Sequence, residues 1–111
     1  MKKIDDMVFK IKADFLKALA HPVRLQIIEY LKNGEASVGK LVQELGVEQS
    51  SLSRHLGILR DLGVLEARPE KTNVYYNLHD HDILKVLRPI AELLRKKLRR
   101  SEKLLESLGK E

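Results

Sequence analysis

Apolar side chains recur every three or four residues along most of this 111-residue chain, a spacing typical of amphipathic helices. The helix expected from about residue 48 to residue 62 has a leucine stripe on one side, made of Leu52, Leu56, Leu59 and Leu62. The opposite side carries short polar groups, one cation and a glycine: Gln49, Ser50, Ser53, Arg54 and Gly57. The leucine side must be buried. The polar side is then free to press closely against another molecule.

A second, shorter helix is expected immediately before this one, over residues 38–45, with Gly46 between the two. A short helix, a tight turn containing glycine and a second helix with a polar outer face form the helix-turn-helix arrangement. Its second helix enters the major groove of DNA, where each base pair displays a distinct pattern of donors and acceptors. The sequence therefore predicts a helix-turn-helix over residues 37–62.

The segment after the second helix predicts a β-hairpin over residues 64–78. An alternating stretch leads into turn-forming residues at 68–73, and a second strand follows at 74–78. A hairpin attached to the recognition helix is a wing, and we expect Arg68, Lys71 and Thr72 at its tip to touch the DNA backbone or minor groove. The expected fold is thus mainly α with a small β-hairpin, formed by residues 1–111 as a single winged helix-turn-helix domain.

Helices are also expected at both ends of the chain. Apolar residues recur at helical spacing from residue 4 to residue 19, and Pro22 is well placed at the first turn of a further helix that ends at Asn33-Gly34. His21, beside that proline, is interpreted as a structural or capping residue. Residues 36–38 either pair as a third small strand or cap the next helix through Ser37.

The longest pattern lies at the carboxy terminus, where a two-in-seven seam extends over more than three heptads. It consists of Leu84, Leu87, Ala91, Leu94, Leu98, Ser101, Leu105 and Leu108. A helix of this length, about 39 Å, outgrows the small domain before it, so much of the seam needs a partner outside its own chain. A two-fold dimer is the commonest solution. Pro89 predicts either a kink or a helix that effectively starts there.

Several ordered segments of the chain resemble the ArsR/SmtB family of winged helix-turn-helix repressors. They are Ala20-His21-Pro22-Val23-Arg24-Leu25-Gln26-Ile27-Ile28, Leu41 to Leu45, Gln49-Ser50-Ser51-Leu52-Ser53-Arg54-His55-Leu56, Leu59-Arg60-Asp61-Leu62-Gly63-Val64-Leu65 and Tyr75-Tyr76-Asn77-Leu78. The resemblance covers about residues 10–95. It implies a DNA-binding, homodimeric transcriptional repressor of an inverted-repeat operator, with the helices at 1–19 and 80–108 forming the dimer interface. For the first of these helices, ordinary core packing is the alternative.

The metal sites known in this family do not match this sequence. In metal-sensing relatives the corresponding segment is Glu-Leu-Cys-Val-Cys-Asp-Leu. This chain has Ser37 and Gly39 at the two thiolate positions of that segment, and it contains no cysteine. The family's second site falls on Asp80, Asp82, Leu93 and Lys96, of which the last two cannot bind zinc. We therefore expect no metal ligands and no cofactor.

The run His79-Asp80-His81-Asp82 still resembles a ligand cluster, although capping of a helix start is the favoured interpretation. A metal-responsive repressor with a non-standard site near His79 to Asp82 stays open as an alternative. The inducer is unknown, because an organic ligand at the dimer interface, such a metal site and no inducer at all are all compatible with the sequence.

The net charge of +5 is unevenly distributed. Residues 85–103 contain eight Lys or Arg and two Glu, whereas residues 36–76, here called the reading unit, carry five basic and five acidic side chains. Attraction to phosphates supplies much of the affinity of a protein for DNA, and a neutral reading unit adds no net positive charge to this attraction. Specific contacts, which a dimer makes twice, must then supply the missing affinity. The cations of residues 95–100 form either a solvated face or a contact with flanking DNA phosphates.

The predicted DNA-contacting residues are Gln49, Ser50, Ser53, Arg54, His55, Arg68 and Lys71. Arg54 suits a bidentate contact to guanine or a charged contact to phosphate, while His55 either joins this set or faces inward and positions the helix. No catalytic constellation is present, so no enzyme is expected. A winged helix that binds another protein is the rival class. No apolar run approaches the roughly 18 residues of a membrane span, and we expect a cytoplasmic protein.

Overall fold

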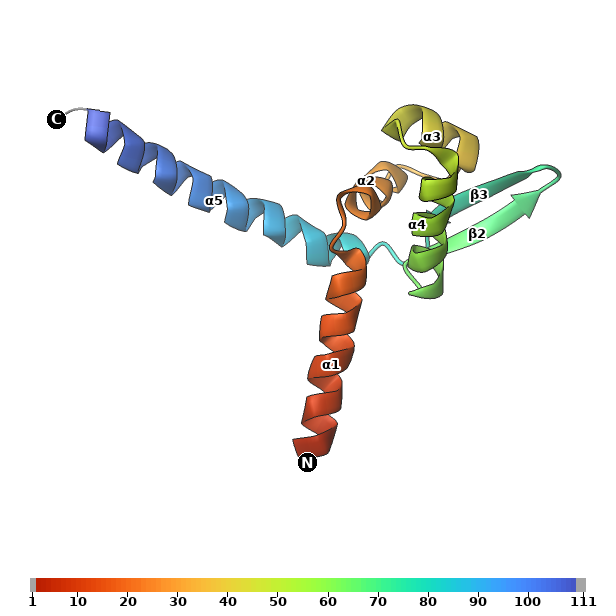
Figure 1. Cartoon of the computed structure of the whole chain (residues 1–111), viewed down its shortest axis with the longest axis horizontal. Coiled ribbons are helices and arrows are strands. Elements are labelled where there is room, and N and C mark those ends of the chain that lie inside the picture. The colour runs from red at the N-terminus through yellow and green to blue at the C-terminus, as the bar shows by residue number, and fades with distance from the viewer. Residues whose placement is uncertain (1, 110–111) are drawn as a thin grey trace. The chain divides into compact units, whose positions relative to one another are not determined.

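The computed structural model describes residues 2–109, which form five helices and three short strands (Figure 1). One compact unit extends through Asp80 and a second begins at His81. The first unit contains α1 (Lys2–Leu19), α2 (Pro22–Leu31), β1 (Ala36–Ser37), α3 (Val38–Leu45), α4 (Gln49–Asp61), β2 (Leu65–Glu70) and β3 (Asn73–Leu78). The second consists of α5 (Ile83–Gly109). This order confirms a mainly helical winged helix-turn-helix fold.

The three strands form one antiparallel sheet in the order β1-β3-β2. The β2–β3 ladder continues to the pair Glu70–Asn73, so only Lys71 and Thr72 form the turn. The broad turn predicted over residues 68–73 is therefore wrong, and Arg68 lies within a strand. Pro69 does not interrupt the ladder, because β2 is an edge strand and an edge position does not require its amide hydrogen.

Side-chain caps fix where two of the helices begin. The Nδ1 atom of His21 accepts a hydrogen bond from the amide of Val23 at 3.2 Å, and Pro22 occupies the first turn of α2. This confirms the capping role predicted for His21. Ser37 pairs with Tyr75 in the sheet, and its Oγ also accepts from the amide of Lys40 at 3.1 Å. The strand and the cap expected around residue 37 thus coexist.

Helices α2, α3 and α4 pack together to form the core of the first unit. Its fully buried side chains are Ile27, Ile28, Leu31, Leu41, Leu52, Leu56 and Leu59. Each such burial contributes about 1.5–3 kcal/mol relative to exposure. Leu62 is only half-buried, because α4 ends at Asp61 and Leu62 is its C-cap. Three of the four stripe leucines therefore anchor the recognition helix.

Helix α1 packs only through its last turns. Leu19 is buried and Phe15 is half-buried, whereas Ile4, Val8 and Ile11 are exposed. Most of its apolar stripe is thus open to solvent in a single chain, so core packing within the chain does not account for it.

Helix α5 is continuous from Ile83 to Gly109 and passes through Pro89, so of the two predicted alternatives the one in which the helix effectively starts at the proline is wrong. Its seam residues Leu94, Leu98, Leu105 and Leu108 are between 53% and 68% exposed. No helix within residues 2–109 has both the length and the apolar content that crossing a bilayer requires.

Candidate nucleic-acid interface

The outer face of α4 presents short polar groups to solvent. Gln49, Ser50, Ser53 and Arg54 are all exposed, while the leucine stripe behind them is buried. The turn before α4 is set by Gly46, which caps α3 at a φ of 64°, a left-handed conformation that glycine adopts without strain. Ser50 donates a 2.5 Å hydrogen bond to Glu48 at the start of α4, so the hydroxyl proton of Ser50 is already engaged.

Arg54 is the cation of this outer face. Within residues 2–109 its side chain makes no hydrogen bond or ion pair. A guanidinium has five N–H donors in a planar fork that matches the acceptor edge of guanine or the oxygens of a phosphate. Its donors are therefore available to a second molecule without loss of an internal contact.

His55 differs from its neighbours, because it is only 3% exposed. Its Nδ1 accepts a hydrogen bond from Nε of Arg24 at 3.1 Å, and its ring centroid lies 4.3 Å from that of His21. The same Arg24 donates to the carbonyl oxygen of Ala18 at 2.6 Å. These contacts tie α4 to the start of α2 and the end of α1.

The predicted DNA contact of His55 is therefore corrected. A side chain enclosed by the chain's own residues does not reach a base edge, and His55 takes the inward, positioning role that the sequence had left as its alternative. Burial lowers the pKa of His55, and the neighbouring charges of His21, Arg24 and Arg54 lower it further. No local pattern in the sequence marks Arg24 as its partner, because Arg24 lies 31 residues from His55.

Arg68, in the wing, is exposed but engaged with two carboxylates. It contacts Glu35 through Nη2 and Nε at 2.7 and 3.2 Å, and Glu70 through Nη1 at 2.6 Å. Its guanidinium also lies over the ring of Tyr75 at 4.8 Å. The hydrogen bond to Glu35 and, to a smaller extent, the one to Glu70 raise the pKa of Arg68. The hydrogen bond from Arg68 in turn lowers the pKa of Glu35.

These contacts change what Arg68 is free to do. Its donors point to carboxylates of its own chain, so a phosphate must compete with them. Lys71 is exposed at the tip of the hairpin, at a φ of 54°. Of the two cations predicted at the wing tip, Lys71 therefore lies there and Arg68 does not.

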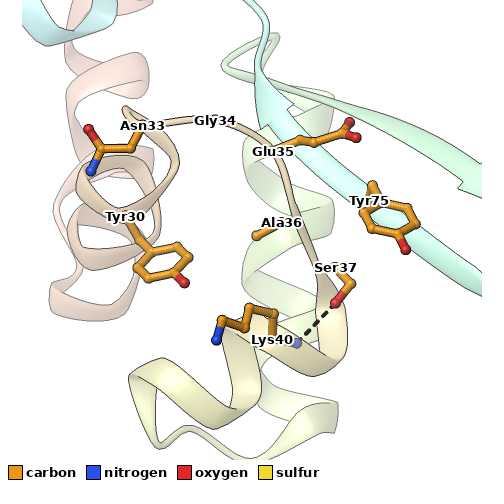
Figure 2. A pocket seen from close by; sticks show the side chains of 8 residues that line it. All are labelled: Tyr30, Asn33, Gly34, Glu35, Ala36, Ser37, Lys40 and Tyr75. Atoms are coloured by element: carbon orange, nitrogen blue, oxygen red, sulfur yellow. Dashed lines mark hydrogen bonds between the residues drawn. The ribbon is translucent and has the colours of Figure 1, made fainter.

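A cavity of about 420 Å³ lies at the base of the wing, between the end of α2, the start of α3, β1 and β3 (Figure 2). Its lining consists of Tyr30, Asn33, Gly34, Glu35, Ala36, Ser37, Lys40 and Tyr75. Lys40 is paired with Glu44 at 2.9 Å, and the Asn33 side chain points away from the other lining side chains. The cavity thus offers phenol and hydroxyl groups but no concentrated charge.

The segment from His79 to Asp82 shows local pairings. Nδ1 of His79 lies 3.1 Å from a carboxylate oxygen of Glu66, and Asp82 pairs with Lys85 at 3.1 Å. The described part of the chain contains no group of three or more metal-ligating side chains. A non-standard metal site here therefore has no supporting cluster.

Comparisons with known proteins place these features in context. Residues 21–67 match the model of the family described as bacterial regulatory protein, arsR family. An uncharacterised HTH-type transcriptional regulator of Mycobacterium tuberculosis, Rv0081, is 38% identical over 102 residues, which cover 91% of this chain and 90% of that protein. Its crystal structure has a TM-score of 0.77 over 85% of this chain and 95% of that one.

Two further solved structures are informative. The transcriptional repressor BigR from Xylella fastidiosa is 32% identical, with a TM-score of 0.70 over 84% of this chain and 95% of its own. The homodimeric winged helix-turn-helix DNA-binding domain of a Mycobacterium bovis protein is 28% identical, with a TM-score of 0.74 over 86% and 89% of the two chains.

Proposed function

This chain belongs to the arsR family of bacterial regulatory proteins, and from that premise we propose that it is a homodimeric transcriptional repressor that binds an inverted-repeat DNA operator. The observation that carries the proposal is the outer face of α4. Small polar side chains face solvent there together with Arg54, whose side chain has no partner among the described residues, on a helix held from behind by fully buried leucines. Such a face fits the major groove, where one helix is admitted and base edges are exposed.

Each α4 helix would read one half-site. Arg54, with Gln49 and Ser53 beside it, is proposed to contact base edges, and Ser50 to act as an acceptor or a backbone contact. Lys71 at the hairpin tip would contact phosphate or the minor groove, joined by Arg68 once its carboxylates release it. Two-fold symmetry requires half-sites about 34–36 Å apart, one helical turn of DNA.

The dimer is supported by the apolar surfaces that a single chain leaves open. On α1, Ile4, Val8 and Ile11 are exposed, and on α5 the seam leucines are more than half exposed. Contiguous apolar patches of this kind mark protein interfaces, and a second copy is the simplest partner. In this proposal the whole chain, residues 1–111, works as one domain, with 1–19 and 80–108 for dimerisation, 37–62 for base contacts and 64–78 as the wing.

The proposal includes no catalytic role, no cofactor and no metal inducer, and it places the protein with the DNA in the cytoplasm. Ser37 and Gly39 occupy the family's thiolate positions, and Leu93 and Lys96 occupy half of its second site. A protein-binding winged helix is the competing function, because the reading unit carries no net charge.

Selection from a random pool of DNA duplexes tests the proposal. The purified chain should enrich a palindrome whose half-sites are one helical turn apart, and a mobility shift should show one dimer per site. Failure to enrich any palindrome, with binding to random duplex abolished by modest salt, would favour the protein-binding function. The oligomeric state is tested separately, by sedimentation of the purified chain at micromolar concentration. A strictly monomeric chain at that concentration would contradict the proposed dimer.

A further inference from the structure

One face of α5 gathers cations that have no acidic partner in the described part of the chain. Lys96, Arg99, Arg100 and Lys103 surround a single hollow of about 260 Å³, and all four are exposed. We call these four residues the cationic patch. Within residues 2–109 none of them makes an ion pair, whereas other cations of the same helix do: Arg95 contacts Glu92 at 2.7 Å.

The position of the cationic patch on the helix is determined by the α-helical period. The seam residues Leu98, Ser101 and Leu105 follow each other at spacings of three and four. With 3.6 residues per turn, the four cations fall on the side of the helix opposite this seam. A helix that pairs along its seam therefore leaves the cationic patch open to solvent.

The charge distribution of the chain indicates what such a patch attracts. The reading unit contains five basic and five acidic side chains, whereas residues 85–103 contain eight basic and two acidic ones. Attraction to the phosphate backbone supplies most non-specific DNA affinity and a large part of specific affinity. In this chain the reading unit adds no net positive charge to that attraction.

We propose that the cationic patch of α5 binds the phosphates of duplex DNA that flanks the operator. This inference rests on the proposed function and adds to it a second contact surface outside the helix-turn-helix. The patch consists of two lysines and two arginines without aromatic side chains, a composition suited to phosphate oxygens and not to stacking on bases. Phosphate contacts position a protein on the duplex but carry no sequence information.

The test uses two full-length variants with equal loss of charge. In the first, Lys96, Arg99, Arg100 and Lys103 are replaced by Gln. In the matched control, Lys3, Lys10, Lys12 and Lys17 of α1, all exposed, are replaced by Gln. Operator affinity is measured for both variants and the unmodified chain between 50 and 200 mM salt, after sedimentation has established that each is dimeric.

The expected result is a shallower salt dependence for the patch variant alone. One lost phosphate contact in each protomer lowers the slope of log K against log salt by about 1.8 per dimer. Over this fourfold salt range the affinity of the unmodified chain should then fall about twelvefold more than that of the patch variant. The sequence selected from the random pool should not change, and a chain with Arg99→Lys and Arg100→Lys should keep the original slope.

Three results would overturn the inference. If the patch variant keeps the original slope while the unmodified chain binds its operator, the patch is a solvated face and the proposed function stands. If both variants lose the same slope, the effect comes from net charge and not from this face. If the unmodified chain selects no operator at all, the proposed function fails and the inference fails with it.

Discussion

The buried imidazole of His55 predicts that acid loosens the recognition helix. Its Nδ1 accepts the N–H of Arg24 at 3.1 Å, so the neutral ring must leave this nitrogen without a proton. Protonation would turn the acceptor into a donor that faces a guanidinium. It would also place a positive charge among the cationic neighbours Arg24 and Arg54, beside His21.

The sign and size of the effect follow from linkage between protonation and folding. The pKa of His55 is below its ordinary value of 6.5, first through burial and then through these neighbouring charges. Between the two pKa values the unfolded chain binds more protons than the folded one, so stability rises with pH. The stabilisation is complete above pH 6.5 and is lost as the pH falls toward the folded value, at a rate of at most about 1.4 kcal/mol per pH unit per chain.

Urea unfolding between pH 5 and 8, at one fixed protein concentration, measures this slope. A His55→Gln variant should have a lower free energy of unfolding at pH 8 and a flatter dependence on pH. His81→Gln is the matched control, because His81 is exposed, and it should keep the original slope. The carboxyl groups of Asp14 and Glu35, whose pKa values are lowered from 3.8 and 4.5, lose their contributions below this range. An unchanged slope in the His55→Gln variant would refute the assignment.

Three further predictions concern single side chains. Replacing Arg54 with Ala should weaken operator binding by about 1–3 kcal/mol if it reads a base. Arg54→Lys should keep the affinity of the unmodified chain only if the contact is to phosphate, since a lysine lacks the planar fork that a base contact needs. Equal affinity of the unmodified chain and both variants in a mobility shift would exclude a base contact and a phosphate contact alike. Glu35→Gln should remove one of the two carboxylates that engage Arg68 and steepen the salt dependence of operator binding, whereas Glu66→Gln, which removes the same charge, should have a smaller effect. Leu56→Ala, at a fully buried position, should lower the free energy of unfolding by about 2–5 kcal/mol in urea titrations.

The elements that the sequence predicted well are those specified by neighbouring residues. The leucine stripe of α4 has helical spacing, Pro22 and His21 mark the start of α2, and Gly46 marks the turn between α3 and α4. In each case the signal lies within a few positions of the feature that it predicts. Local periodicity and capping preferences are therefore sufficient to identify the helix-turn-helix.

The features that the sequence did not predict depend on contacts between distant residues. Arg24 and His55 are 31 positions apart, and Glu35 and Arg68 are 33 positions apart. No periodic pattern shows that the imidazole turns inward or that the wing arginine is already paired. The hairpin turn was predicted too wide for a related reason: Pro69 and the polar residues near it look like turn chemistry, and only the register with β3 shows that they form a ladder.

Ser37 has two structural roles, and together they have a mechanical consequence. Its backbone pairs with Tyr75 of the hairpin, while its hydroxyl caps the first turn of α3. Any displacement of the hairpin therefore pulls directly on the helix that supports α4. Ser37 thus joins the hairpin to the start of α3, so a molecule that displaces one of these two elements should also shift the other.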